Sequence, residues 1–155
     1  MVAQVEVVPM VSLPDDVERL ARVAEGEEMD FVRRLIDDWG DGSNRFDQPD
    51  EVLLGVISPS RLVGVGGLNR DPYLDDPSVG RIRHVYIEPG YRGRGVGREL
   101  VGALVDRARG HFARVRLRVS PLGSPDFYLA IGFSPTTESD ATHTLRLTPH
   151  GILPR

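Results

Sequence analysis

The chain has 155 residues, of which 40% are hydrophobic and 27% charged, a composition typical of one globular domain spanning residues 1–155. It has no cysteine, which excludes disulfides, thiolate zinc sites and cysteine nucleophiles. No apolar run approaches the roughly 20 residues of a membrane span, and the N-terminus lacks the pattern of a secretory signal. We therefore expect a cytoplasmic protein with no membrane partner.

Charge is divided unevenly along the chain. The net charge is -4, and all 19 basic residues are arginines. Residues 1–80 hold 17 acids and 7 arginines, whereas residues 81–155 hold 6 acids and 12 arginines. This split predicts two partners of opposite charge, a cationic amine and a polyphosphate, although two solvated faces would produce the same numbers. The negative total and the lack of an aromatic-interleaved basic patch argue against nucleic acid.

Hydrophobic periodicity predicts the elements of the first half. Apolar residues at helical spacing alternate with short apolar runs that are bounded by turn residues. In chain order we expect a strand at 6–9, helices at 14–26 and 31–40, and a hairpin of strands at 52–57 and 62–68.

The second half continues with strands and helices in alternation. We expect a strand at 81–87, a helix with apolar positions from 100 to 112, and a strand at 114–119 in which arginine alternates with apolar residues. A short helix at 126–131 and strands beginning at 133 and 142 complete the chain. The order β-α-α-β-β-β-α-β-α-β-β predicts an α/β domain with a mixed sheet.

The segment from 81 to 97 runs from a strand through a tight turn and a glycine-rich loop into a helix. Such a junction binds phosphate, because the first turn of a helix has unpaired N–H groups and glycines allow an anion to approach them. Arg92, Arg94 and Arg98 would add charged donors at the same point.

Two other phosphate-binding motifs are excluded by this sequence. A P-loop requires a lysine, and the chain has none. A dinucleotide fingerprint requires Gly-x-Gly-x-x-Gly and an acid after the next strand, but here Gly93, Gly95 and Gly97 are evenly spaced and the next strand ends at Arg118-Val119-Ser120.

The remaining pattern closely resembles the GCN5-related N-acetyltransferase (GNAT) superfamily. Arg92, Gly95 and Gly97 match its motif Arg/Gln-x-x-Gly-x-Gly/Ala, and the segment from Phe127 to Phe133 resembles its aromatic-Tyr-x-x-x-Gly-Phe pattern. The asparagine that often precedes this second motif is absent, its place falling in residues 120–125. The resemblance implies a three-layer fold, with a mixed sheet of about six to seven strands, helices on both faces and splayed parallel strands at the cofactor site.

By this resemblance, the protein is an N-acetyltransferase that moves the acetyl group of acetyl-CoA, without a metal, to a primary amine of a small molecule or peptide in a ternary complex. A backbone N–H near Ile87 would polarise the thioester carbonyl. A CoA-binding sensor without catalysis is the alternative, and a homodimer is left open. The implied cofactor residues are Val85, Tyr86, Ile87, Arg92, Gly93, Arg94, Gly95, Val96, Gly97, Arg98 and Ser120.

The resemblance also assigns a general acid, Tyr128, whose phenol suits protonation of the departing thiolate. Its structural alternative is a packed tyrosine bonded to backbone. Of the four histidines, His111, His143 and His150 are interpreted as surface residues.

The general base is not identified by the family pattern. Where family members often carry a glutamate, this chain has Arg81 and Arg83, and arginine does not act as a base. His84 is the nearby group with a suitable pKa, and strand alternation predicts that it shares a face with Ile82 and Tyr86. A water relay, or an amine that arrives neutral, would need no such residue.

The substrate side is expected to include the two N-terminal helices and the loop 69–77. Asn69 and Asp71 are candidate substrate ligands, and acids of this region would attract an ammonium group, with a solvated loop as the alternative. Arg83 would instead orient a substrate carboxylate. The arginines at 114, 116 and 118 either serve the ribose 3′-phosphate of the cofactor or line an exposed side.

Overall fold

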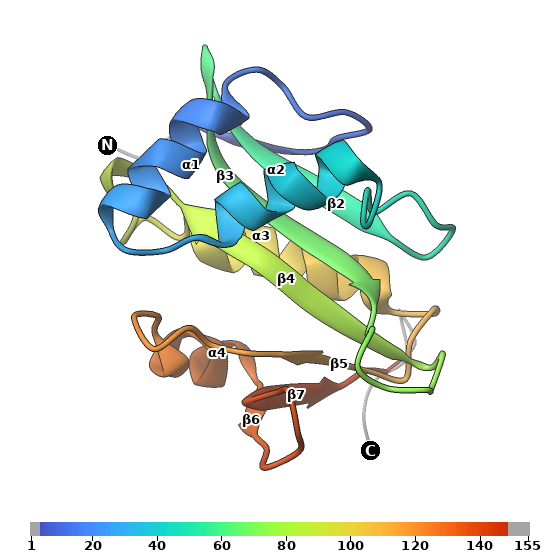
Figure 1. Cartoon of the computed structure of the whole chain (residues 1–155). Coiled ribbons are helices and arrows are strands. Elements are labelled where there is room, and N and C mark those ends of the chain that lie inside the picture. The colour runs from blue at the N-terminus through green and yellow to red at the C-terminus, as the bar shows by residue number, and fades with distance from the viewer. Residues whose placement is uncertain (1–3, 149–155) are drawn as a thin grey trace.

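A mixed sheet of seven strands runs through the centre of the computed structural model, which describes residues 4–148 (Figure 1). The strand order is β1-β2-β3-β4-β5-β7-β6, with all neighbours antiparallel except β4 and β5. The strands are β1 (Glu6–Pro9), β2 (Val52–Ser58), β3 (Arg61–Arg70), β4 (Val79–Ile87), β5 (Arg114–Leu117), β6 (Ser134–Pro135) and β7 (His143–Arg146). The helices are α1 (Val17–Gly26), α2 (Phe31–Asp41), α3 (Val96–Ala108) and α4 (Pro125–Ile131), with a short 3-10 turn at Pro89–Tyr91.

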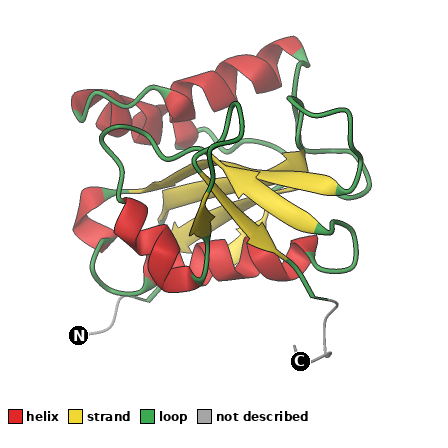
Figure 2. Cartoon of the chain, turned by 90° about the horizontal axis from the view of Figure 1, so that it is seen from below, coloured by secondary structure: helices red, strands yellow, loops and turns green. Residues whose placement is uncertain are grey.

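Helices cover both faces of this sheet (Figure 2). One hydrophobic cluster lies between the sheet and α3, and a second lies between the sheet and the pair α1 and α2. In β2, Leu53 packs in the second cluster and Leu54 in the first, as expected for successive residues of a strand buried on both sides. The predicted α/β class, three layers and mixed sheet are confirmed.

The two parallel strands stay together over a short distance. β4 and β5 pair at Val79 with Arg114, Gly80 with Val115 and Arg81 with Arg116. Beyond these pairs β4 follows β3, whereas β5 follows β7. The two strands therefore separate after Arg81 and Arg116, which leaves one edge of β4 without a neighbouring strand.

A β-bulge interrupts β4 at the start of this free edge. Arg83 pairs with Gly67 and Tyr86 with Val65, so two residues of β4 lie opposite one residue of β3. One of the two, His84, has a φ of +60°, in the left-handed region. Because of the extra residue, Tyr86 packs in the α1 and α2 cluster while Ile82 packs in the α3 cluster. The prediction that Ile82 and Tyr86 share a face is wrong.

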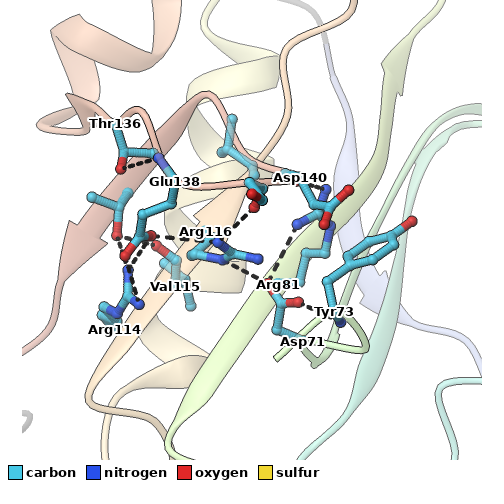
Figure 3. Close-up of polar contacts among 12 residues, drawn as sticks. Asp71, Tyr73, Arg81, Arg114, Val115, Arg116, Thr136, Glu138 and Asp140 are labelled. Carbon is cyan, nitrogen blue, oxygen red and sulfur yellow. Dashed lines mark hydrogen bonds and ion pairs between the residues drawn. The ribbon is translucent and has the colours of Figure 1, made fainter. Parts of the chain in front are cut away.

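A buried ion cluster holds β4 and β5 together at the point where they begin to separate (Figure 3). The carboxylate of Asp71 accepts hydrogen bonds from Arg116 Nε at 2.9 Å and Arg81 Nη1 at 3.3 Å. Arg81 Nη2 also donates to the Asp140 carbonyl at 2.6 Å, and Arg116 Nη1 to the Ser139 carbonyl at 3.1 Å. The cluster thus joins β4, β5, the loop after β3 and the loop before β7.

Burial in this cluster overturns one sequence interpretation and sets the charge of Asp71. The side chains of Asp71 and Arg116 are both 0% exposed, so Arg116 does not lie on an exposed strand face. Burial raises the pKa of Asp71, but hydrogen bonds from Arg116 and from the Tyr73 N–H, with the charges of Arg81 and Arg116, outweigh burial and lower it. Asp71 is therefore ionised at neutral pH.

None of the helices within residues 4–148 has the length and apolar character needed to cross a bilayer.

We predict that Asp71→Asn lowers the free energy of unfolding by about 3–5 kcal/mol at pH 7, because it leaves the buried Arg81 without a counter-charge and Arg116 with only its 3.4 Å contact to Glu138. Urea denaturation measures the loss, with Asp75→Asn, an exposed acid of the same loop, as the matched control. Since the pKa of Asp71 is lowered by folding, its contribution is present above pH ~4 and is lost as the pH falls through its native pKa. A loss below about 1 kcal/mol would contradict the structural role.

Candidate active site

A cleft of about 1220 Å³ opens where β4 and β5 separate. Its walls come from β4, the glycine-rich loop before α3, the segment after β5, α4 and the junction of α1 with α2. Among residues 4–148 there is no group of three or more His, Cys, Asp or Glu side chains that could hold a metal ion.

The glycine-rich loop presents unpaired backbone donors at the head of α3. Within the described residues, none of the N–H groups from 93 to 98 donates a hydrogen bond, and the first to do so is that of Glu99, to the Gly95 carbonyl at 3.0 Å. Gly93 and Gly95 have φ of +74° and +80°, which glycine adopts at little cost. Unpaired amides at the positive end of a helix have the chemistry that suits an anion, and Gly93, Gly95, Gly97 and Arg98 of this segment line the cleft.

The start of α3 is packed closely against α4. A methyl group at Gly97 would lie 3.3 Å from the ring of Phe127 and 3.8 Å from Ile87. Phe127 also lines the cleft, so it both supports the loop and forms part of the wall.

The free edge of β4 offers a second set of backbone groups. The Glu88 N–H donates to the Val63 carbonyl of β3 at 2.8 Å. Because successive peptide groups of a strand alternate in direction, the N–H and carbonyl of Ile87 face away from β3, toward the gap left by β5. The Ile87 carbonyl accepts a hydrogen bond from Arg92 Nε at 2.8 Å, while its N–H remains available on this edge.

Arg92 braces the loop with its side chain. Its two terminal nitrogens donate to the Glu27 carboxylate at 2.8 and 2.7 Å, and its guanidinium lies 5.3 Å from the centre of the Tyr86 ring. The Tyr86 hydroxyl also donates to Glu27. Hydrogen bonds from Arg92 lower the pKa of Glu27, and burial raises that of Tyr86. The Arg92 side chain therefore ties the loop to the end of α1, and the sequence did not reveal Glu27 as its partner.

Some of the other predicted cofactor residues line the cleft, and others do not. Val85, Arg98 and Ser120 line the cleft. Val96 is buried in the core beneath the loop, so only its backbone is available to a ligand. Arg94 is exposed and is not part of the cleft wall.

Tyr128 lies on α4 with its ring packed between Phe127 at 4.9 Å and Phe133 at 5.8 Å, measured between ring centres. Burial raises its pKa to about 12, so the phenol keeps its proton. Its hydroxyl makes no hydrogen bond with residues 4–148, whereas the structural alternative required a hydroxyl bonded to backbone. His143, expected at the surface, is 6% exposed and lies behind this ring. His150 lies outside the described residues.

His84 lines the cleft but is a weak base there. Burial, followed by the charges of Arg83 and Arg34, lowers its pKa to about 3. Its Nε2 is buried without a hydrogen-bond partner in the described structure, and its ring meets that of Phe46 edge to face at 6.1 Å. The imidazole is therefore neutral at physiological pH, and its low pKa argues against the predicted role of general base.

The three candidate substrate ligands do not come together. Arg83 lines the cleft, half-buried. Asp71 is enclosed by its two arginines, and Asn69 is 6% exposed on β3, paired with Arg81 of β4. Neither Asn69 nor Asp71 reaches the cleft wall, so their positions argue against a direct contact with substrate.

Comparison with known proteins identifies the family. A model described as the acetyltransferase (GNAT) family matches residues 14–133, from before α1 to the end of the second sequence motif. The chain belongs to the GNAT family of acetyltransferases.

Two individual proteins share limited sequence with this chain. The N-alpha-acetyltransferase RimI of Mycobacterium tuberculosis is 32% identical over 85 residues, which cover 55% of this chain and 53% of RimI. The uncharacterized protein ML0378 of Mycobacterium leprae is 31% identical over 80 residues, covering 52% of this chain and 22% of that protein. The chain thus spans about half of the first relative and a smaller part of the second.

Solved GNAT structures share the fold over nearly the whole chain. A candidate acetyltransferase from Exiguobacterium sp. 255-15 has a TM-score of 0.83 and 23% identity, covering 92% of this chain and 93% of its own. A GNAT family N-acetyltransferase of Escherichia coli, solved in complex with CoA, has a TM-score of 0.68 and 18% identity, covering 96% and 85%. At these identities the likeness concerns the fold.

We predict that His84 makes stability depend on pH. In the unfolded chain a histidine takes up a proton below pH ~6.5, whereas native His84 does so near pH 3, so stability falls as the pH drops between these values. Lowering the pH from 7.5 to 5.0 should cost up to about 2 kcal/mol in the wild type and much less in His84→Asn, since asparagine tolerates positive φ without titrating. Urea denaturation at both pH values tests this, and equal losses in the two proteins would contradict it.

Proposed function

We propose that this GNAT-family chain is an N-acetyltransferase that transfers an acetyl group from acetyl-CoA to a primary amine of a small molecule or peptide while both are bound. The observation that carries the proposal is the row of unpaired amides from 93 to 98, beside the free edge of β4. Neutral, fixed donors at a helix N-terminus suit a diphosphate, and a free strand edge suits a chain that contains amides.

The described residues fit the parts of acetyl-CoA. The amides from Gly93 to Arg98 would hold the pyrophosphate, and the exposed backbone of Val85 and Ile87 would pair with the pantetheine arm. The cleft is larger than the roughly 300–1,000 Å³ typical of small-molecule sites, as a ligand of this length requires. When bound, acetyl-CoA supplies an acetyl group already activated as a thioester.

The chain's own groups would assist at two atoms. The Ile87 N–H would donate to the carbonyl oxygen, where negative charge develops as the amine forms its bond to carbon. Tyr128 would donate its phenolic proton to the sulfur as the carbon–sulfur bond breaks, and would regain a proton from solvent. The brace of Arg92 and Glu27 would hold the loop in the binding geometry.

No side chain of the cleft is proposed as the base. His84 titrates near pH 3, and arginines occupy the β4 positions where a carboxylate would act. The amine would lose its proton to water before or during attack. Because no base is identified, a CoA-binding sensor without catalysis is the alternative function.

Turnover separates the two functions. The protein is incubated with acetyl-CoA and a panel of amines, and thiol release is followed with a chromogenic reagent. An amine that raises the rate above background supports the transferase. If CoA binds in calorimetry but no amine raises thiol release, the transferase is wrong and the sensor remains.

We predict that Gly95→Ala weakens CoA binding about five- to thirtyfold. Gly95 has a φ of +80°, a conformation that costs a residue with a side chain about 1–2 kcal/mol. The free loop would avoid this cost by turning its amides away, so CoA binding would have to restore the strained conformation. Gly102→Ala is the matched control, since it lies inside α3 at a position where an added methyl group meets nothing within 4 Å. Calorimetric titration with CoA gives both dissociation constants, and equal affinities would contradict an amide-based anion site.

We predict that Tyr128→Phe lowers kcat by about 10² or more, the usual effect of removing a general acid. The substitution keeps the ring that packs between Phe127 and Phe133, so the fold is retained. Tyr91→Phe is the control, because that hydroxyl bonds Ser58 at 2.9 Å outside the cleft. A Tyr128→Phe enzyme with full kcat would exclude the phenol as the acid.

A further inference from the structure

The wall of the cleft formed by α2, the loop after β3 and the first part of β4 is rich in arginine. We call this region the acceptor wall and define it by Arg34, Tyr73, Arg81, Arg83 and His84, all of which line the cleft. It lies next to the place where β4 and β5 separate, away from the amides of the glycine-rich loop.

The arginines of this wall differ in how far they are neutralised. Arg81 is bonded to Asp71, and its guanidinium lies 4.7 Å from the centre of the Tyr73 ring. Arg34 forms an exposed ion pair with Asp30 at 3.4 Å. Arg83 forms no ion pair and no side-chain hydrogen bond with the described residues, yet it is half-buried.

Other charged groups of the cleft do not compensate Arg83. Arg118, directly after β5, is a further cation of the lining with no ion pair among residues 4–148. The acids of the lining are Glu28, which is exposed, and Asp30, which is engaged with Arg34. His84 is neutral and its buried Nε2 has no partner in the described structure. The acceptor wall is therefore positively charged and has an unfilled hydrogen-bond position.

We propose that the acceptor amine carries a carboxylate, as a free amino acid does, and that Arg83 binds this carboxylate. The inference rests on the proposed acetyl transfer and names the class of its acceptor. A guanidinium offers two parallel donors to a carboxylate, and a half-buried one gains more from such a partner than an exposed one. Cationic acceptors such as polyamines are disfavoured by the same wall.

This assignment reverses one reading of the sequence. Acids of the N-terminal half were expected to attract an ammonium group, but Asp71 is enclosed by arginines and Asp75 and Asp76 are not part of the cleft lining. The charge that reaches the acceptor wall is that of arginines from both halves of the chain.

The experiment compares matched pairs of acceptors. The twenty L-amino acids and their carboxamides are each incubated with acetyl-CoA and the full chain, and kcat/KM is obtained from thiol release and from mass spectrometry of the acetylated product. For the best side chain, we expect the free acid to exceed its amide at least tenfold in kcat/KM. An amide equal to or better than its acid would overturn the proposal while leaving acetyl transfer intact.

Substitution of Arg83 tests the assigned residue. Arg83→Gln should reduce the preference for acid over amide to less than threefold, mainly through a higher KM for the acid. Arg146→Gln, which removes an exposed arginine of β7 outside the cleft, is the matched control and should keep the preference. If Arg83→Gln keeps the full preference, Arg83 does not bind the carboxylate and the assignment is wrong. If no acceptor of either kind raises thiol release, the proposed function itself fails.

Discussion

The carboxylate of Asp71 lies between two buried guanidinium groups and is the counter-charge that both share. Those groups belong to Arg81 and Arg116, the last pair of residues at which β4 and β5 run side by side. Two buried cations repel each other in a medium of low dielectric constant, so the strands stay together at this point only with an anion between them. The ion cluster lies at the end of the paired part of β4 and β5. The two strands separate immediately beyond it, and the cleft begins there.

The cleft walls formed by β4 and by the glycine-rich loop both depend on the contacts that position β4. Its partner β3 pairs along one edge, and the bulge at His84 turns Tyr86 toward α1, where its hydroxyl meets Glu27. Glu27 also receives Arg92 from the glycine-rich loop, so α1, β4 and the loop form one connected unit. The free amides at the head of α3 are thereby fixed by contacts on the opposite face of the sheet.

The sequence predicted those parts of the site that depend on residues close together in the chain. The helix and strand order follows from periodicity, and the amides of the loop follow from Gly93, Gly95 and the helix start after them. Predictions from the sequence were wrong where a residue's position depends on partners that lie far away in the chain. The face of His84 depends on a register with β3, and Asp71 looks like a solvated loop acid until Arg116, 45 residues later, is placed beside it. For Arg116 the sequence left open a phosphate contact or an exposed side, because nothing local indicates that the loop before β7 covers it.

Overall charge also misleads, because many acids of the N-terminal half are engaged with arginines. Glu18 and Glu25 bind Arg33, and Glu27 binds Arg92, so little negative charge reaches the cleft. Burial, followed by the charges of Arg83 and Arg34, lowers the pKa of His84, and the cleft arginines that no carboxylate neutralises would act in the same direction on the ammonium group of a bound acceptor. A lower amine pKa means a larger fraction of neutral nucleophile at pH 7. Arg83 would be neutralised by the carboxylate that it binds, so under the proposed function the remaining cleft arginines, such as Arg118, would reduce the need for a general base, which the β4 strand does not provide.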